Sequence, residues 1–372
     1  MRSGAPRLGI IGAGQLAQMS LAPAIALGID VKILASSSGD SAARYFPAAL
    51  GDYRNFDQLM EFAAECDVIT FEHELVPNGH IRRLEESGKV VRPSSKALLH
   101  AQDKVHMRES FSKIGLPQPE WKVISSPEEI QRYPVILKAS TGGYDGRGVR
   151  LVSDAEQAKD VLTQWPRALC EEVVGFDREL SIMIARSPHN QVSTWATTET
   201  VQADGICIQT ISPAPELAEQ TAFQAQEIAL AIAEHIQLIG VMAVELFDVG
   251  GNLLINEIAL RPHNSGHWTI EGSKTSQFEQ HIRAVLDLPL GDTSLNQRWA
   301  VMGNVLGGVK SDLYRPYLHV FARDPQIKVH NYGKEVRPGR KVGHVCAVGD
   351  DLQALRERVT HAVDYISGVI SE

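Results

Sequence analysis

The sequence of 372 residues has few cysteines, no long apolar run and no excess of positive charge. Its four cysteines are scattered without a C-x-x-C pair, which argues for small packing side chains rather than a disulfide framework or a cysteine metal site. No apolar run approaches the roughly 18 residues that cross a bilayer, and no signal-peptide pattern is visible. The net charge of -9 argues against nucleic-acid and membrane-surface partners. We expect a cytoplasmic, reduced protein, whose substrate could still be a small anion held in a local basic pocket.

The first 95 residues alternate strand-like and helical segments. Residues 7–11, 31–34 and 67–71 predict strands, whereas residues 15–27 and 56–64 predict helices. This alternation is typical of a parallel sheet covered by helices. The rest of the chain mixes shorter units, and its longest predicted helix, at 216–235, leads into two strands at 241–249 and 253–260.

A G-x-G-x-x-A pattern, Gly12 to Ala17, lies between the first predicted strand and the first predicted helix. Glycines at such a turn let the backbone approach a phosphate, and the helix N-terminus attracts anions. A dinucleotide fingerprint also needs an acidic residue about 20 residues further on, where this sequence has only Ala35, Ser36 and Ser37. The pattern therefore disfavours NAD and leaves either a loop beside another ligand, such as a sugar phosphate, or a plain tight turn.

A second glycine-rich segment, Lys138 to Gly148, is more specific. It contains four glycines and two basic residues between two predicted strands. It is not G-x-x-x-x-G-K-[ST], which excludes a P-loop, but it suits a hairpin whose backbone N–H groups close over phosphates. Lys138 ends an apolar strand, where an α- or β-phosphate would be a natural partner. The alternative is a glycine-rich hairpin with a snorkelling lysine.

Two carboxylates, Glu245 and Glu257, interrupt strands that are otherwise apolar. Carboxylates are seldom buried unless they are paired or bind a metal. A three-residue turn at Gly250–Asn252 would place the two acids opposite each other, whereas a two-residue turn would place them on opposite faces. We predict the three-residue turn, because a shared Mg²⁺ then explains both acids. Two structural acids bonded to arginine or to the backbone are the alternative.

A polar segment follows directly, from Arg261 to Trp268. Arg261 and Asn264 could orient a small planar oxyanion, and His263 could move protons near neutral pH. A His-x-x-x-His metal pair is disfavoured, since no glutamate stands beside the first histidine, and an ordinary polar loop is the other reading. Near the end of the chain, the basic residues of 334–344 flank a Pro-Gly turn and could converge on one anion or form a solvated loop.

Together these segments resemble the N5-carboxyaminoimidazole ribonucleotide synthetase family of ATP-grasp enzymes over essentially the whole chain. The most specific stretches are 141–148, 256–257 together with 262–267, and 337–344, with further matches at 12–16 and 70–74. The resemblance implies an α/β (α+β) fold of three domains. These are an N-terminal parallel-sheet domain at 1–96, an ATP-grasp domain at 97–290 with a lid subdomain at about 120–175, and a small C-terminal domain at 291–372.

The resemblance also implies an activity. The family carboxylates 5-aminoimidazole ribonucleotide with ATP and bicarbonate in purine synthesis, and it forms homodimers. Bicarbonate is activated as carboxyphosphate, and the amine captures that intermediate or the CO₂ released from it. Its cofactors would be ATP and Mg²⁺. Mg²⁺ would bind Glu245 and Glu257, and the reacting groups would lie among Tyr144, Arg147, Arg261, His263 and Asn264. The ribonucleotide would contact Gln15, Glu74, Lys334, Arg340 and Lys341.

ATP contacts are implied for a larger set: His100, Lys104, Lys138, Gly143, Tyr144, Asp145, Gly146, Arg147, Gly148, Val149, Glu171, Glu172, Val173, Val174, Glu179, Gln202, Asn256 and Glu257. Three positions depart from the family pattern. His100 stands where arginine is frequent, Gln202 where histidine is common, and Leu260 where the usual segment has proline. The other hypotheses are a related ligase, such as a formate-dependent glycinamide ribonucleotide transformylase or a biotin carboxylase, and a non-catalytic nucleotide-binding protein.

Overall fold

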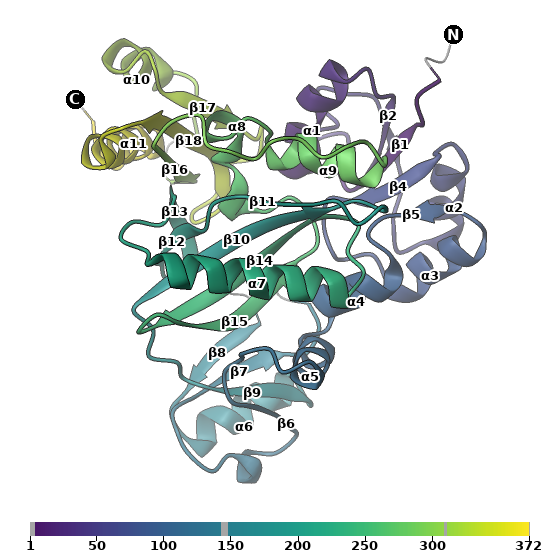
Figure 1. Ribbon diagram of the computed structural model, residues 1–372, viewed down its shortest axis with the longest axis vertical. Helices are drawn as coiled ribbons and strands as arrows, with labels where there is room; N and C mark the ends of the chain where they lie inside the picture. The colour runs from purple at the N-terminus through teal and green to yellow at the C-terminus, as the bar shows by residue number, and fades with distance from the viewer. Residues whose placement is uncertain (1–3, 143–147, 309–310, 372) are drawn as a thin grey trace.

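The computed structural model describes residues 4–142, 148–308 and 311–371. The described residues form three sheets. In Figure 1 the N-terminal sheet and the C-terminal end of the largest sheet lie above the central strands of that sheet, and a small lobe with the third sheet lies below. None of the described helices combines the length and apolar character needed to cross a membrane. The α/β fold class predicted from the sequence is confirmed.

The N-terminal sheet is parallel, with the order β3-β2-β1-β4-β5. Its first strand is fully buried, because apolar residues fill both of its faces. The predicted alternation of strand and helix is confirmed. The elements are β1 (Leu8–Ile11), α1 (Gln15–Ala26), β2 (Val31–Ala35), β3 (Ala48–Leu50), α2 (Phe56–Ala64), β4 (Val68–Phe71), α3 (Asn78–Glu86) and β5 (Val90–Val91).

Two helices, α4 (Ser95–Gln102) and α5 (Lys104–Lys113), connect this sheet to the lower lobe. Ser94 caps α4, and Asp103 caps α5 by accepting N–H bonds from Val105 and His106. The lobe is a four-stranded antiparallel sheet, ordered β6-β9-β7-β8, with one helix packed on it. Its elements are β6 (Trp121–Ile124), η1 (Pro127–Glu129), β7 (Val135–Ala139), β8 (Val149–Val152), α6 (Ala155–Gln164) and β9 (Ala168–Glu172).

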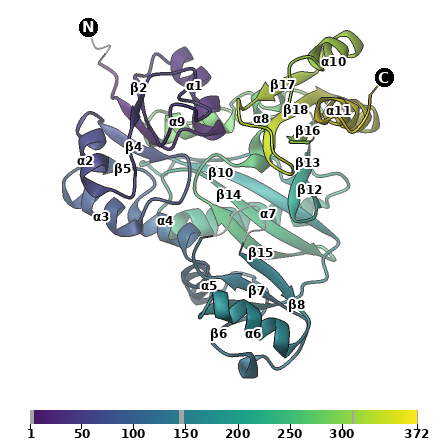
Figure 2. The same ribbon diagram turned by 180° about the vertical axis from the view of Figure 1, so that it is seen from behind.

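The largest sheet follows the order β15-β14-β10-β12-β13-β16-β18-β17, with β11 paired to β10. It runs from the central domain into the C-terminal strands, so the two share one continuous sheet (Figure 2). The strands are β10 (Arg178–Arg186), β11 (Val192–Thr194), β12 (Thr198–Ala203), β13 (Ile206–Ser212), β14 (Gly240–Val249), β15 (Asn252–Ala259), β16 (Trp299–Leu306), β17 (Lys328–Asn331) and β18 (Lys341–Gly349).

Helices cover this sheet and complete the cores. The long α7 lies across the central strands (Figure 1) and buries Ile228 and Ile232 in a cluster that includes Ile182 and Val244. Burial of this apolar surface supplies the main stabilisation of the layer. The helices are α7 (Glu219–His235), η2 (Asn264–Gly266), α8 (Thr269–Gly272), α9 (Gln277–Val285), α10 (Tyr317–Arg323) and α11 (Leu352–Ser367).

The turn between β14 and β15 differs from the prediction. Val249 pairs with Asn252, so the loop has two residues, Gly250 and Gly251, and both have positive φ. Such a turn matches the twist of the two strands and favours glycine. The predicted three-residue turn at Gly250–Asn252 is therefore wrong. Glu245 nevertheless faces Glu257, because the register shifts between Glu245 and Leu246 through a β-bulge.

Candidate active site

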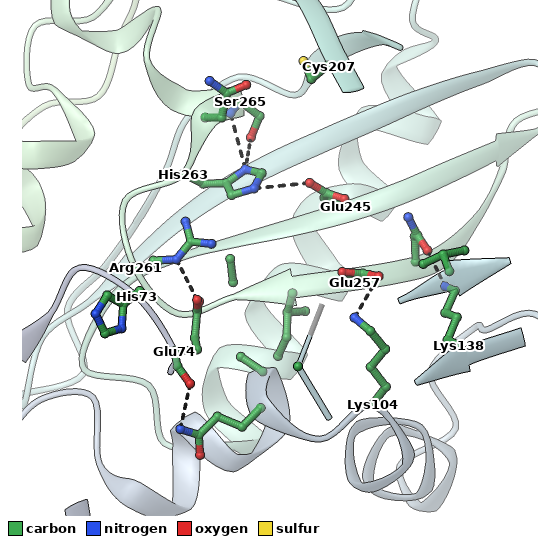
Figure 3. A pocket seen from close by; sticks show the side chains of 18 of the residues that line it. His73, Glu74, Lys104, Lys138, Cys207, Glu245, Glu257, Arg261, His263 and Ser265 are labelled. Atoms are coloured by element: carbon green, nitrogen blue, oxygen red, sulfur yellow. Dashed lines mark hydrogen bonds and ion pairs between the residues drawn. The ribbon is translucent and has the colours of Figure 1, made fainter. Parts of the chain in front are cut away.

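One large cavity, of about 1000 Å³, opens where the N-terminal domain, the lobe and the central sheet meet. Its wall includes residues from all of these parts and two lysines from the C-terminal segment, Lys334 and Lys341. Figure 3 shows Glu245 and Glu257 on neighbouring strands, with Lys104 and Lys138 approaching from the side of the lobe. The cavity therefore brings together groups far apart in the sequence, as ligand sites between domains commonly do.

The two glutamates face each other across β14 and β15, yet their environments differ. Glu257 Oε1 forms an ion pair with Lys104 Nζ at 2.9 Å, and Glu245 Oε1 lies 3.3 Å from His263 Nε2. Burial and the neighbouring carboxylate of Glu257 raise the pKa of Glu245 to about 7. Burial acts in the same direction on Glu257, but Lys104 and Lys138 outweigh it and lower its pKa to about 2. Two like charges held this close favour a cation between them.

A buried charge network lies behind this pair. Lys138 Nζ lies 2.9 Å from Glu171 and donates to the Asn256 amide oxygen, also at 2.9 Å. Arg108 Nε donates to the other Glu171 oxygen at 2.7 Å, and Arg108 is fully buried. Burial raises the pKa of Glu171, but Lys138 and Arg108 together lower it below its ordinary range. Its carboxylate is thus a fixed anion.

Sequence reasoning did not identify Arg108, and it assigned Glu171 to the adenine wall. A signal was present, because Arg108 follows Lys104 by four residues on α5 and so lies on the same helix face. Glu171 lines the cavity together with the segment that follows it, Glu172 to Val174, but its carboxylate is bonded within the charge network.

The predicted adenine end of the cavity has an aromatic wall. The Phe176 and Phe247 rings stack with centroids 4.7 Å apart, and both line the cavity. Glu179 and Gln202 also line it and hydrogen-bond to each other. Burial raises the pKa of Glu179. Flat apolar surface beside one acid suits a purine base and its sugar hydroxyls.

The segment after β15 is held rigidly. His263 Nδ1 contacts the Ser265 hydroxyl at 2.9 Å, and its backbone N–H donates to Gln277 Oε1 at 2.7 Å. Gln277, on α9, also donates to the His263 carbonyl. The side-chain amides of Asn264 and Asn304 form two hydrogen bonds with each other, at 2.8 and 2.9 Å. The structure therefore adds Gln277 and Asn304 as positioning residues, whose contacts are too distant in sequence to infer from a motif.

The N-terminal domain contributes through two glutamates. Glu74 accepts from Arg261 Nε at 2.7 Å and from the Leu260 N–H at 3.2 Å, which ties this domain to the end of β15. Glu72 accepts from the Gly14 N–H at 2.8 Å and the Leu16 N–H at 3.3 Å. A Cβ at Gly14 would lie 2.3 Å from a Glu72 oxygen. The first glycine loop thus receives a protein carboxylate at the start of α1.

The remaining predicted residues fall into three groups. Gln15, Val149, Asn256, Arg261, Lys334 and Lys341 line the cavity. His100 is buried with Nε2 2.9 Å from the Ser110 hydroxyl, and Arg340 is exposed; among the described residues neither belongs to the cavity wall. Gly143, Tyr144, Asp145, Gly146 and Arg147 lie outside the described residues, and Gly148 immediately follows them.

Comparison with known proteins identifies the family to which this chain belongs. A ribonucleotide synthetase preATP-grasp domain matches residues 6–102, an ATP-grasp domain matches residues 109–278, and a phosphoribosylaminoimidazole carboxylase C-terminal domain matches residues 300–358. N5-carboxyaminoimidazole ribonucleotide synthase of Mycobacterium tuberculosis is 45% identical over 98% of this chain and 88% of its own length. The chain belongs to the N5-carboxyaminoimidazole ribonucleotide synthase family.

Solved structures of N5-carboxyaminoimidazole ribonucleotide synthases extend this similarity to the fold. The Thermus thermophilus synthetase is 36% identical with a TM-score of 0.87, and the alignment covers 98% of this chain and 99% of that one. The Aspergillus clavatus synthase, solved with ADP and 5-aminoimidazole ribonucleotide, is 28% identical with a TM-score of 0.88 and the same coverage. The resemblance and the ATP-grasp fold predicted from the sequence are confirmed.

Proposed function

We propose that this protein carboxylates 5-aminoimidazole ribonucleotide with bicarbonate and ATP, giving N5-carboxyaminoimidazole ribonucleotide, ADP and phosphate in purine synthesis. The observation that carries the proposal is the opposed pair Glu245 and Glu257, in one cavity with Lys104, Lys138 and the segment from Arg261 to Ser265. Nucleotide phosphates and a small oxyanion could meet there. The relative that binds ADP and 5-aminoimidazole ribonucleotide supports both ligands.

The chemistry needs two transfers. A bicarbonate oxygen attacks the γ-phosphorus of ATP, ADP leaves, and carboxyphosphate forms. The substrate amine then bonds to carbon, either that of carboxyphosphate, from which phosphate leaves, or that of CO₂ already released from it with phosphate, and the amine proton passes to a base. Because both transfers move negative charge, fixed cations beside the phosphates stabilise them. Lys104 and Lys138 would supply those cations, with their ammonium groups already held by Glu257 and Asn256.

Bicarbonate and the amine would lie near Arg261 and His263. Glu74 orients the Arg261 guanidinium, and Ser265 together with Glu245 fixes the His263 ring. A ring held between a hydroxyl and a carboxylate can accept or return a proton in a defined direction. Lys334 and Lys341 would bind the ribonucleotide phosphate, since both line the cavity.

The residues present fit Mg²⁺. No group of three or more His, Cys, Asp or Glu able to hold a metal occurs among the described residues, so the protein would supply only the two glutamates. Mg²⁺ commonly takes one or two carboxylates and completes its shell with phosphate oxygens and water. When bound it would neutralise charge on the ATP phosphates. Of the pair, Glu245 would have to lose the proton that its raised pKa favours.

The proposed function is tested by ADP release from the purified protein. ADP should appear when ATP, Mg²⁺ and 5-aminoimidazole ribonucleotide are all present, and labelled bicarbonate should enter the product. ADP release that requires formate and glycinamide ribonucleotide would assign a different ligase. ATP binding without turnover on any acceptor would indicate a non-catalytic protein. We also propose a cytoplasmic homodimer, as the family resemblance implies, and sedimentation of the purified protein tests the dimer.

A further inference from the structure

Regular pairing of β14 with β15 would not place Glu257 opposite Glu245. The two-residue turn fixes Leu246 opposite Ile255. If that register continued, Glu245 would face Asn256, and Glu257 would project from the other face of the sheet, because successive side chains alternate. Instead Glu245 faces Glu257, so one extra residue, Asn256, is inserted in β15.

One buried side chain contacts the backbone at this insertion. Arg108 Nη1 donates to the Ile255 carbonyl at 2.7 Å, and Arg108 Nη2 donates to the Asn256 carbonyl at 2.9 Å. Consecutive carbonyls of a regular strand point to opposite edges. Here both accept from one guanidinium, because the bulge turns both to the same side. β15 is an edge strand among the described strands. On its outer side the Ile255 N–H donates to the Pro117 carbonyl at 2.9 Å, and the two carbonyls accept from Arg108.

We propose that Arg108 is a positioning residue, which holds the bulge at Asn256 and so sets Glu257 opposite Glu245. The helix α5 approaches the bulge at two points, since Lys104, one turn earlier, contacts Glu257 itself. The planar fork of arginine suits two adjacent acceptors, and its third nitrogen, Nε, is fixed by Glu171. An arginine needed only to neutralise Glu171 would not require the two backbone bonds.

The test is Arg108→Lys, which keeps a positive charge for Glu171 but offers one nitrogen in place of the fork. The matched control is Arg178→Lys on β10. Arg178 also joins a carboxylate, Asp248, and a backbone carbonyl, that of Pro215, within the same domain but away from the glutamate pair. The inference rests on the proposed function, in which Glu245 and Glu257 bind Mg²⁺. The first measurement is therefore the binding of Mn²⁺ in the presence of a non-hydrolysable ATP analogue, monitored by electron paramagnetic resonance.

We expect Arg108→Lys to weaken Mn²⁺ binding by about 10- to 100-fold, the range for groups that orient metal ligands. The Mg²⁺ concentration for half-maximal turnover should rise in parallel. KM for the ribonucleotide should change by less than about twofold, because Arg108→Lys removes no proposed contact with the ribonucleotide. Arg178→Lys should alter neither metal measurement. In a crystal structure of Arg108→Lys, the pairing of Glu245 with Glu257 should be shifted or mixed.

Three results would overturn the inference. The first is a lowered Tm with Mn²⁺ binding at the wild-type level, which would make Arg108 a structural residue only. The second is an equal loss of Mn²⁺ binding in Arg178→Lys. The third is an unchanged bulge in the variant's crystal structure, which decides the matter even if the wild type binds no Mn²⁺. A wild type that binds Mn²⁺ but does not carboxylate would contradict the proposed function and leave the role of Arg108 to these readouts.

Discussion

The substitution Glu171→Gln tests the buried charge network most directly. Glu171 is 3% exposed and is the common partner of Arg108, at 2.7 Å, and Lys138, at 2.9 Å. Glutamine has nearly the same shape but no charge, and its NH₂ group must face one of the two cations. Removing one partner of a buried ion pair leaves uncompensated charge and costs about 3–5 kcal/mol. We expect a loss of that size in the free energy of unfolding.

Nucleotide should offset part of this loss. If the ATP phosphates approach Lys138, they restore an anion that the variant lacks, so a non-hydrolysable ATP analogue with Mg²⁺ should raise Tm more in Glu171→Gln than in wild type. The control is Glu172→Gln, an exposed neighbour that accepts from the Glu120 N–H and should lose less than about 1 kcal/mol. Thermal and urea unfolding measure both. Equal losses in the two variants would refute the reasoning.

Three further predictions follow from the site and its surroundings. Glu257→Gln should lower ADP release by about 100-fold or more, because it removes a proposed metal ligand; near wild-type rates at low Mg²⁺ would contradict this. Lys341→Ala should raise KM for the ribonucleotide by about tenfold, as expected for a lost charged hydrogen bond, and more than Arg340→Ala, because only Lys341 of these two lines the cavity; the reverse order would restore the sequence-based assignment to Arg340. Burial lowers the pKa of His281 from 6.5 to about 4. As pH falls from about 6.5 to 4, the unfolded chain therefore takes up a proton that the folded protein does not, and the free energy of unfolding falls by about 3 kcal/mol. His281→Gln should flatten that part of the profile of stability against pH, and an unchanged profile would contradict the assignment.

Much of the fold could be predicted because its signals are local. The N-terminal strands are short apolar runs separated by helical periodicity, and the order of such elements strongly restricts a parallel sheet. The acids Glu245 and Glu257 were detectable because charge is rare inside apolar strands. Lys138 and Arg261 were detectable as basic residues at the ends of apolar strands, and Lys104 was found through the family resemblance. All three line the cavity.

Other features depend on partners far away in the chain. The glycines at Gly12 and Gly14 suggested a loop beside a ligand, and Gln15, which follows them, lines the cavity. The group that accepts from the Gly14 N–H is the Glu72 carboxylate, 58 residues further on. His100 was matched to a nucleotide contact, yet its ring packs against Ser110 and His106. Neither outcome has a local signal, because each depends on which side chain fills the space after the domains pack.

The carboxylate pair shows both contributions. The sequence alone determined that two acids lie on adjacent strands joined by a glycine turn, because apolar alternation and turn chemistry are properties of neighbouring residues. It did not determine their register. A two-residue turn would have separated the acids, and only the bulge at Asn256 brought them face to face. That bulge is bonded to Arg108 from a different helix, so the pairing was decided by tertiary contacts between segments that lie about 150 residues apart.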